Sequence, residues 1–377
     1  MKHPFLDLGE VNRPYRDELA AAALRVIDSG RYVGGAEVAA LEADLSRQLA
    51  VPHAVAVSNG LDALRLILRA YKELGEMADG DEVLVPANTY IASVLAVTDA
   101  GLTPVLVDAD PHTMNIDTAR LEAALTPRTR AVMPVHLYGR VAWDGRLAAF
   151  ARRHGLRVVE DAAQSIGARH ASGGLHGSVW AGALGDAGAL SFYPTKNVGA
   201  LGDAGAVLTH DARLAAAVRA LANYGSDRRY HNLYAGLNCR MDPLQAAMLG
   251  VKLRHMEAEN AARARRAAVY DALIDHPAVT RPEVPADGEH VWHQYVVRVA
   301  GGRRDALAAA LARQGIGTDV HYAVPPHLQP CYRGRLAHGP LPVAERLADE
   351  VLSLPVATGT TEDDAAEIAR AINGIAL

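Results

Sequence analysis

Lys196 is the residue of this chain whose position most clearly suggests a chemical function. It lies in residues 191–197, between the apolar run 187–190 and the glycine-rich segment 199–205. A lysine held among small residues at the end of a buried strand is an unusual place for a solvated charge. A lysine amine can form a Schiff base with an aldehyde cofactor, and its pKa shifts readily on burial. The position therefore predicts a lysine that acts as a nucleophile.

A carboxylate ends a second predicted strand, at Asp161. An anion beside a pyridine nitrogen keeps that nitrogen protonated, so that the ring can accept electrons from a carbanion. A lysine amine and a strand-end aspartate are the pair that pyridoxal phosphate requires. Taken alone, Asp161 is more often an ordinary carboxylate that caps the next turn. Gln164, three residues on, could reach the ring hydroxyl of the cofactor from the same turn. The alternative is that Gln164 is a solvated amide without a functional role.

Other residues fit a bound phosphate and a flat ring. Residues 58–64 form a strand-to-helix turn, whose backbone N–H groups can cradle a phosphate; the same residue types are also common helix caps. Ser191 either bonds the phosphate or is a buried serine satisfied by the backbone. Tyr90 either stacks on a cofactor ring or packs in the core.

Two histidines, His321 and His327, lie six residues apart in a proline-rich stretch. No carboxylate or cysteine completes a set of metal ligands around them, so we expect substrate contacts and no metal site. A structural role for either histidine is the alternative.

Composition narrows the class of protein. The chain has 377 residues, 50% of them hydrophobic and 21% charged, with a net charge of −5. It has no basic run, so we expect no nucleic-acid partner. Two cysteines without paired spacing favour a reducing compartment. The N-terminus lacks an apolar leader and no stretch approaches a membrane span, so we expect a cytoplasmic protein without membrane contact.

Short apolar runs alternate with helical patterns along the first half of the chain. Continuous apolar strands are typical of a sheet covered on both faces, and the alternation predicts an α/β fold with a mostly parallel sheet. The strands are expected at residues 54–57, 83–85, 105–107, 131–135 and 156–159, and the helices at residues 13–29, 37–50, 61–74, 91–99, 117–125 and 144–153.

One long charged helix is predicted from Pro243 to about Tyr270, as a connector leaving the large domain. Beyond it, residues 291–299 alternate like a strand, and residues 304–314 and 362–372 have helical patterns. We therefore predict two domains, a large cofactor-binding domain over residues 1–254 and a small α+β domain over residues 255–377.

Several ordered motifs together resemble the DegT/DnrJ/EryC1/StrS family of pyridoxal-phosphate-dependent sugar-nucleotide aminotransferases. The resemblance covers essentially the whole chain. It implies the fold type I of these aminotransferases, with a seven-stranded type of sheet and a smaller C-terminal domain. The motifs lie at residues 58–64, 86–93, 134–139, 160–164, 191–205, 236–247 and 321–332.

The resemblance also implies roles for single residues. Lys196 would be the Schiff-base lysine, Asp161 the partner of the pyridine nitrogen and Gln164 the partner of the ring hydroxyl. The asparagine matching Asn238 reaches the phosphate of the neighbouring subunit in relatives, which implies a homodimer with shared active sites. Further cofactor contacts are expected from Gly60, Leu61, Tyr90 and Ser191, and substrate contacts from Tyr193, His321, Tyr322 and His327.

The activity implied is transfer of an amino group from glutamate, through the pyridoxamine phosphate form of the cofactor, to a nucleotide-linked keto sugar. We expect amination at C3 of a dTDP-3-keto-6-deoxyhexose. Some family members are dehydratases with histidine in place of the lysine, so Lys196 favours transamination. The alternatives are amination at C4 of a GDP-, UDP- or dTDP-4-keto sugar, a lyase or dehydratase of the same fold, and a non-catalytic regulatory protein.

Overall fold

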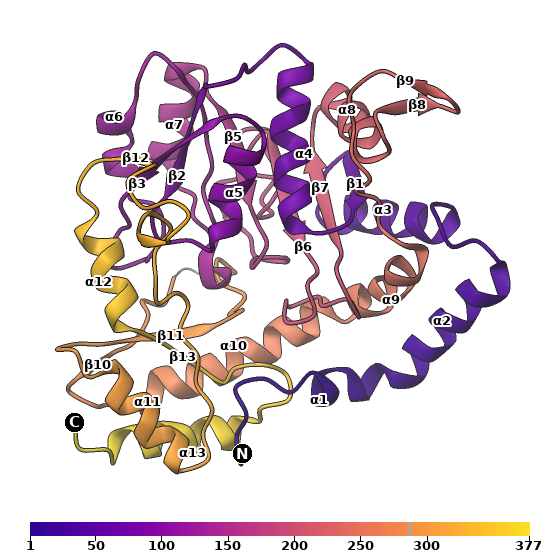
Figure 1. Cartoon of the computed structure of the whole chain (residues 1–377). Helices are drawn as coiled ribbons and strands as arrows, with labels where there is room; N and C mark the ends of the chain where they lie inside the picture. Colours follow the sequence, from indigo (N-terminus) through magenta and orange to yellow (C-terminus); the bar gives the residue numbers. More distant parts are fainter. Residues whose placement is uncertain (286–287) are drawn as a thin grey trace.

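A computed structural model describes residues 1–285 and 288–377. An N-terminal arm leads into α1 (Leu8–Asn12), the 3-10 turn η1 (Arg13–Tyr15), α2 (Arg16–Ser29) and α3 (Ala36–Gln48). Helices α1 and α2 run along one side of the molecule toward α3 (Figure 1). The helix predicted over residues 13–29 is therefore present, with its first three residues in the tighter 3-10 form.

A large sheet forms the centre of the molecule (Figure 1). In the described part of the chain it has eight strands, and only β7 runs antiparallel to its neighbours. The predicted mostly parallel α/β sheet is confirmed, and two residues of the C-terminal part, in β12, add a short strand at its edge. The order across the sheet is β1 (His53–Val57), β7 (Gly205–Thr209), β6 (Ala187–Ser191), β5 (Arg157–Asp161), β4 (Thr129–Val132), β2 (Glu82–Pro86), β3 (Thr103–Val107) and β12 (Ala337–His338).

Helices cover both faces of this sheet, which explains its continuous apolar strands. Val83 and Val85 pack on the face covered by α4 (Gly60–Glu73), α5 (Ile91–Asp99) and α8 (Ala212–Ala222). Leu84, between them, packs on the opposite face with Phe150 of α7 (Gly145–His154). The predicted helix over residues 117–125 is shorter, a 3-10 turn η2 (Thr118–Arg120) followed by α6 (Leu121–Ala124).

The predicted single helix from Pro243 to Tyr270 is wrong, because two helices occupy this stretch. Helix α9 (Pro243–Arg254) ends at His255 and α10 (Met256–Leu273) begins directly after it. His255 has φ −101° and ψ −2°, which departs from the helical backbone and separates the two. This break adjoins the boundary predicted between residues 254 and 255. The division into two domains itself stays a prediction.

The C-terminal part has a core of its own. A three-stranded antiparallel sheet packs with α10 and two further helices around Tyr270, Tyr295 and Leu354. No helix within the described ranges is both long and apolar enough to cross a membrane. The elements are β10 (Val279–Thr280), β11 (Tyr295–Val299), α11 (Arg304–Arg313), η4 (Pro326–Leu328), α12 (Pro342–Glu350), β13 (Val351–Leu354) and α13 (Glu362–Asn373). The hairpin of β8 (Ser226–Arg228) and β9 (His231–Asn232) and the turn η3 (Leu137–Gly139) belong to the part before α9.

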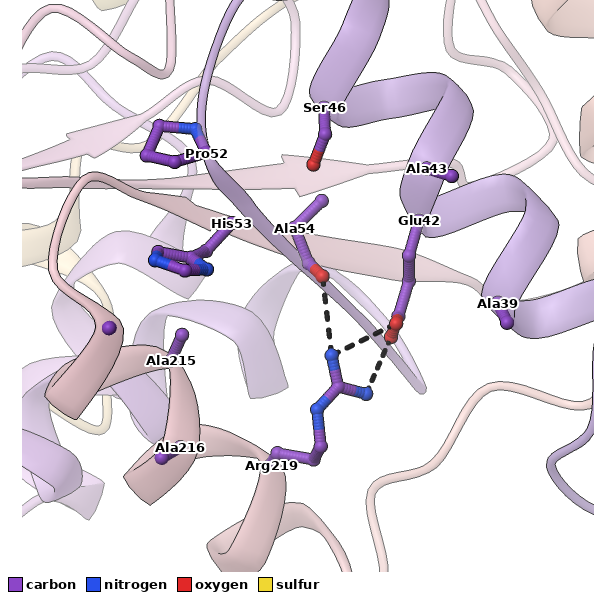
Figure 2. Close-up of a pocket in the computed structure, with 11 residues that line it drawn as sticks. Ala39, Glu42, Ala43, Ser46, Pro52, His53, Ala54, Ala215, Ala216 and Arg219 are labelled. Atoms are coloured by element: carbon purple, nitrogen blue, oxygen red, sulfur yellow. Dashed lines mark hydrogen bonds and ion pairs between the residues drawn. The ribbon is translucent and has the colours of Figure 1, made fainter.

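Glu42 of α3 and Arg219 of α8 cap the edge of β1 at Ala54 and Ala56, before the point where Val57 is bridged to Arg240. Glu42 Oε1 accepts the N–H of Ala56 at 2.9 Å. Arg219 donates to both carboxylate oxygens of Glu42, at 2.9 Å each, and to the carbonyl of Ala54 at 3.5 Å (Figure 2). The ion pair lies in a crevice of about 450 Å³. It binds backbone groups that a further strand would otherwise use, and so protects the edge of the sheet.

Candidate active site

The predicted site residues gather where the strands of the large sheet end. β1, β2, β5 and β6 all run in the same direction, so their carboxyl ends lie at one edge of the sheet. This edge is where open α/β sheets bind ligands. Asp161 ends β5 and lies opposite Ala189 of β6, and Lys196 follows β6 in the loop to β7.

Most of the surface of Lys196 is covered by protein at this edge. Burial lowers the pKa of its amine from the usual value to about 8, and the negative charge of Asp161 acts in the opposite direction. Near neutral pH the amine therefore holds its proton less tightly than a surface lysine does. A group that gains and loses a proton close to the working pH is suited to acid and base catalysis.

Asp161 is buried and its carboxylate is held on both oxygens. Ser93 Oγ donates to Oδ2 at 2.7 Å, and the N–H of Ala163 donates to Oδ1 at 3.2 Å. Thr89 Oγ1 lies 2.8 Å from Ser93 Oγ. Because the single hydroxyl hydrogen of Ser93 goes to the carboxylate, Thr89 is the donor in this second bond. The chain of hydroxyls fixes the position of the carboxylate.

A phosphate cradle lies at the start of α4. Asn59 caps the helix by accepting the N–H of Asp62 at 2.8 Å, and in the described part of the chain the N–H groups of Gly60 and Leu61 have no acceptor. Ser191 faces this turn so closely that a Cβ on Gly60 would lie 2.6 Å from the Cβ of Ser191. Glycine is thus required by the close approach, and two free N–H groups and a hydroxyl meet at a helix N-terminus.

Gln164, Tyr322 and Tyr90 form a connected group next to Asp161. Gln164 is buried; its Oε1 accepts the N–H of Tyr138, and its Nε2 donates to the hydroxyl of Tyr322 at 3.1 Å. The rings of Tyr322 and Tyr90 have centroids 5.3 Å apart, and Tyr90 is 54% exposed. Tyr90 therefore does not pack in the core, which removes the alternative that the sequence left open for it.

His321 belongs to the same region, because its carbonyl accepts the hydroxyl of Tyr138, the residue whose N–H binds Gln164. Burial lowers the pKa of His321, and the charge of Lys196 acts in the same direction, against the opposing effect of Asp319. Its Nδ1 lies 2.8 Å from Ser353 Oγ. His327 lies elsewhere: its Nε2 is 3.2 Å from Glu345 Oε1, and its ring faces His338 at 5.2 Å. Its predicted contact with substrate stays a prediction without support from these contacts. Tyr193 and Asn238 are exposed.

Sequence reasoning assigned no role to Ser93, nor to the buried pair of Glu160 and His136. The pair is fully buried, with Nε2 2.7 Å from Oε2. Glu160 also accepts the N–H groups of Gly182 and Gly185, at 2.8 and 2.7 Å. Glu160 directly precedes Asp161 in the sequence, and Ser93 and His136 lie within motifs of the resemblance. Their hydrogen-bond partners come from distant segments of the chain, which the sequence does not show.

The residues fit pyridoxal phosphate. The amine of Lys196, with its lowered pKa, suits the aldehyde of this cofactor, and the buried carboxylate of Asp161 suits the pyridine nitrogen. The cradle at Gly60, which a Cβ at that position would fill, suits the phosphate. Lys196, Asp161, Gly60, Leu61 and Ser191 would hold these three groups.

Comparisons with known proteins agree with this geometry. The model of the DegT/DnrJ/EryC1/StrS aminotransferase family matches residues 15–373. A dTDP-3-amino-3,6-dideoxy-alpha-D-galactopyranose transaminase of Aneurinibacillus thermoaerophilus is 43% identical over 98% of both chains. A dTDP-3-amino-3,4,6-trideoxy-alpha-D-glucose transaminase of Streptomyces venezuelae is 44% identical over 94% of this chain and 90% of its own. The crystal structure of NtdA from Bacillus subtilis, with bound PMP, has a TM-score of 0.88 at 29% identity and covers 99% of this chain and 85% of that one.

Proposed function

Because the chain belongs to the DegT/DnrJ/EryC1/StrS aminotransferase family and is a pyridoxal-phosphate-dependent aminotransferase of fold type I, we propose that it transfers an amino group from glutamate to C3 of a dTDP-3-keto-6-deoxyhexose. The observation that carries the proposal is the pairing of Lys196, whose amine has a pKa of about 8, with the buried carboxylate of Asp161. The names of two relatives, both dTDP-3-amino-sugar transaminases, support the nucleotide and the ring position.

Each protein group has a defined task in this reaction. The cofactor, when bound, supplies an aldehyde and a ring that accepts electrons. Lys196 would hold the cofactor through Nζ until an incoming amino group displaces it, and the freed amine would then remove a proton from the glutamate α-carbon and deliver one to C3 of the sugar. Asp161, oriented by Ser93, offers its carboxylate to the pyridine nitrogen. Gly60 and Leu61 donate their N–H groups to the phosphate.

The substrate contacts are proposed from position. His321 and Tyr322 stand next to the cofactor site, where Tyr322 is tied to Gln164. Tyr193, three residues before the lysine, presents an exposed phenol that can bond a sugar or phosphate oxygen. A cytoplasmic location is part of the proposal, supported by the two free cysteines Cys239 and Cys331.

A homodimer with shared sites is also proposed. Large apolar side chains are exposed on α2 and just after it, and on the hairpin of β8 and β9 and just after it, which is unfavourable for a monomer in water. They include Leu24, Ile27, Tyr32 and Val33 in the first group, and Tyr230 and Leu233 in the second. Asn238 follows the second group by a few residues, which suits a side chain that reaches the cofactor phosphate of the partner subunit.

A substrate panel tests the activity. Purified protein loaded with pyridoxal phosphate is mixed with glutamate and, in turn, with dTDP-3-keto, dTDP-4-keto, GDP-4-keto and UDP-4-keto sugars. We expect 2-oxoglutarate and amino sugar in equal amounts with the dTDP-3-keto sugar. Amination of a 4-keto sugar alone would overturn the ring position, whereas consumption of sugar without 2-oxoglutarate would indicate a lyase or dehydratase. An inert protein would favour a regulatory role.

A further inference from the structure

The side chain of Asn197 joins the loop that carries the active-site lysine to two distant segments. It is 4% exposed, and its Nδ2 donates to Asn260 Oδ1 at 2.8 Å and to the carbonyl of Val291 at 3.0 Å. Asn260, on α10, donates in turn to the carbonyl of Ile166 at 3.0 Å. Lys196 is the residue directly before Asn197, so these bonds fix the backbone from which its side chain starts.

The same network sets the tautomer of His293. Both Nδ2 hydrogens of Asn197 have acceptors, so its remaining polar atom, Oδ1, is the one that faces His293 Nδ1, at 3.1 Å. An amide oxygen only accepts, and the hydrogen must therefore sit on Nδ1 of the imidazole.

The surroundings of His293 favour a neutral ring. Burial lowers the pKa of His293 well below its usual value, and four positive or basic neighbours act in the same direction, namely Lys196, Arg263, His321 and His290. Arg263 donates to the carbonyl of His293 at 3.3 Å and so brings a fixed positive charge close to it. The positive charges around the ring would repel a second proton.

We propose that His293 is a positioning residue for Lys196. It donates from Nδ1 to Asn197, which holds the backbone of the lysine loop, and as a neutral ring it adds no positive charge beside the lysine amine. The groups that act on that amine are then the carboxylate of Asp161 and its own burial. The inference rests on the role proposed above for Lys196 in transamination.

Three variants test whether the hydrogen bond that His293 donates to Asn197 is what matters. His293→Leu removes the donor and leaves the buried Asn197 Oδ1 without a partner. His293→Asn keeps a donor, because the amide nitrogen of asparagine takes the place of Nδ1. His276→Leu is the matched control: His276 is likewise held through its ring, by hydrogen bonds to the backbone of Ile375 and Ala278, which belong to neither the lysine loop nor its partners.

The measurement is the rate at which trinitrobenzenesulfonate labels Lys196 in protein free of cofactor, followed by mass spectrometry across a pH series. The chain has only the lysines at positions 2, 72, 196 and 252, so the labelled peptides are distinct. We expect a labelling midpoint near the pKa of about 8 in the wild type, in His293→Asn and in the control. In His293→Leu we expect the midpoint to rise by about one pH unit, because a loosened lysine reaches solvent, and labelling at the wild-type midpoint to fall about fivefold.

An unchanged midpoint in His293→Leu overturns the proposal, and so does a His293→Asn variant that behaves like His293→Leu. If His293→Leu does not fold, nitrogen-15 spectra of histidine-labelled wild-type protein decide. A neutral ring with hydrogen on Nδ1 at neutral pH supports the proposal, and a charged ring or hydrogen on Nε2 overturns it. None of these measurements uses a sugar nucleotide, so failure of the substrate panel would count against the proposed function alone.

Discussion

At the scale of single residues, the site depends on how two charged groups are held. Burial brings the pKa of Lys196 to about 8, and Asp161 is kept in place by a serine hydroxyl that a threonine hydroxyl supports. The lysine therefore exchanges its proton near neutral pH, while the carboxylate cannot turn away from its position. The chemistry comes from two residues, and Ser93 and Thr89 set the orientation of one of them, Asp161.

Lys196→Ala is expected to lower turnover by about a thousandfold or more, since both the covalent anchor and the acid–base group are lost. The visible absorption of covalently held cofactor should disappear while the circular dichroism spectrum is unchanged. Lys2→Ala, at an exposed position, is the control. Retained turnover in Lys196→Ala would exclude the lysine from the reaction.

The covalent attachment of pyridoxal phosphate to Lys196 is expected to speed up as the pH rises through about 8. The unprotonated amine is the nucleophile, and raising the pH increases its fraction until the pKa is passed. Stopped-flow absorbance after mixing cofactor-free protein with cofactor measures this rate. A profile that rises only near the pKa of an ordinary lysine would contradict the effect of burial.

Ser93→Ala is expected to weaken cofactor binding about tenfold, because a hydrogen bond to a charged group contributes roughly 1.5–3 kcal/mol and Asp161 would lose its orientation. Equilibrium dialysis gives the affinity. The control is Thr209→Ala, which removes another buried hydroxyl, one that donates to the carbonyl of Asp186. Thr209 lies at the end of β7 away from the site, so this variant should leave the affinity unchanged. Equal effects of both variants would reduce Ser93 to a general structural role.

At the scale of elements, the large sheet brings the site residues together, and its outer strand β1 has backbone groups that must be kept from pairing with other chains. Parallel strands bring Asp161, Lys196 and the start of α4 to one edge, although they lie far apart in the sequence. At the side of the sheet, β1 has an edge where Glu42 and Arg219 bond the backbone of Ala56 and Ala54. Two side chains thus replace the hydrogen bonds of a missing strand.

Glu42→Ala is expected to lower the free energy of unfolding by about 1–3 kcal/mol, because the N–H of Ala56 loses its acceptor and Arg219 its partner. Light scattering should also rise, since the edge of β1 becomes open to other chains. Urea unfolding measures the stability. Asp44→Ala, which breaks an exposed ion pair with Arg47 on the same helix, should change it by less than about 1 kcal/mol.

At the scale of the whole molecule, the proposed dimer accounts for surfaces that a monomer leaves open. Tyr230 is 88% exposed on the hairpin and Val33 60% exposed after α2. Asn238 lies near the hairpin with its side chain exposed. A partner subunit that covers these surfaces would bring its own Asn238 to a cofactor phosphate.

Mixed dimers test whether the sites are shared. We expect Lys196→Ala and Asn238→Asp each to be nearly inactive alone, the second because a carboxylate would repel the phosphate. Co-expressed, half of the dimers carry one of each chain, and one of their two sites then has neither lesion. Activity should recover to about a quarter of the wild type. No recovery, with mixed dimers verified by mass spectrometry, would mean that each site is built within one chain.

The chemistry and the fold class were readable from local patterns. Lys196 and Asp161 follow apolar strands directly, and the alternation of strands and helices predicts the parallel sheet, because each of these signals is contained in a few neighbouring residues. The sequence also suggested one helix from Pro243 to Tyr270. Helical propensity continues through His255, and only the packing of α9 and α10 against different parts of the molecule determines the break.

Only the tertiary structure decided which residues support the site. Ser93 meets Asp161 across 68 positions of the chain, and His293 meets Asn197 across 96. Such partners leave no periodic trace in the sequence, because the contact depends on where the sheet and the later helices place each backbone. Amino-acid type therefore determined what Lys196 and Asp161 can do, and the packing of distant segments determined the pKa, the orientation and the surroundings with which they do it.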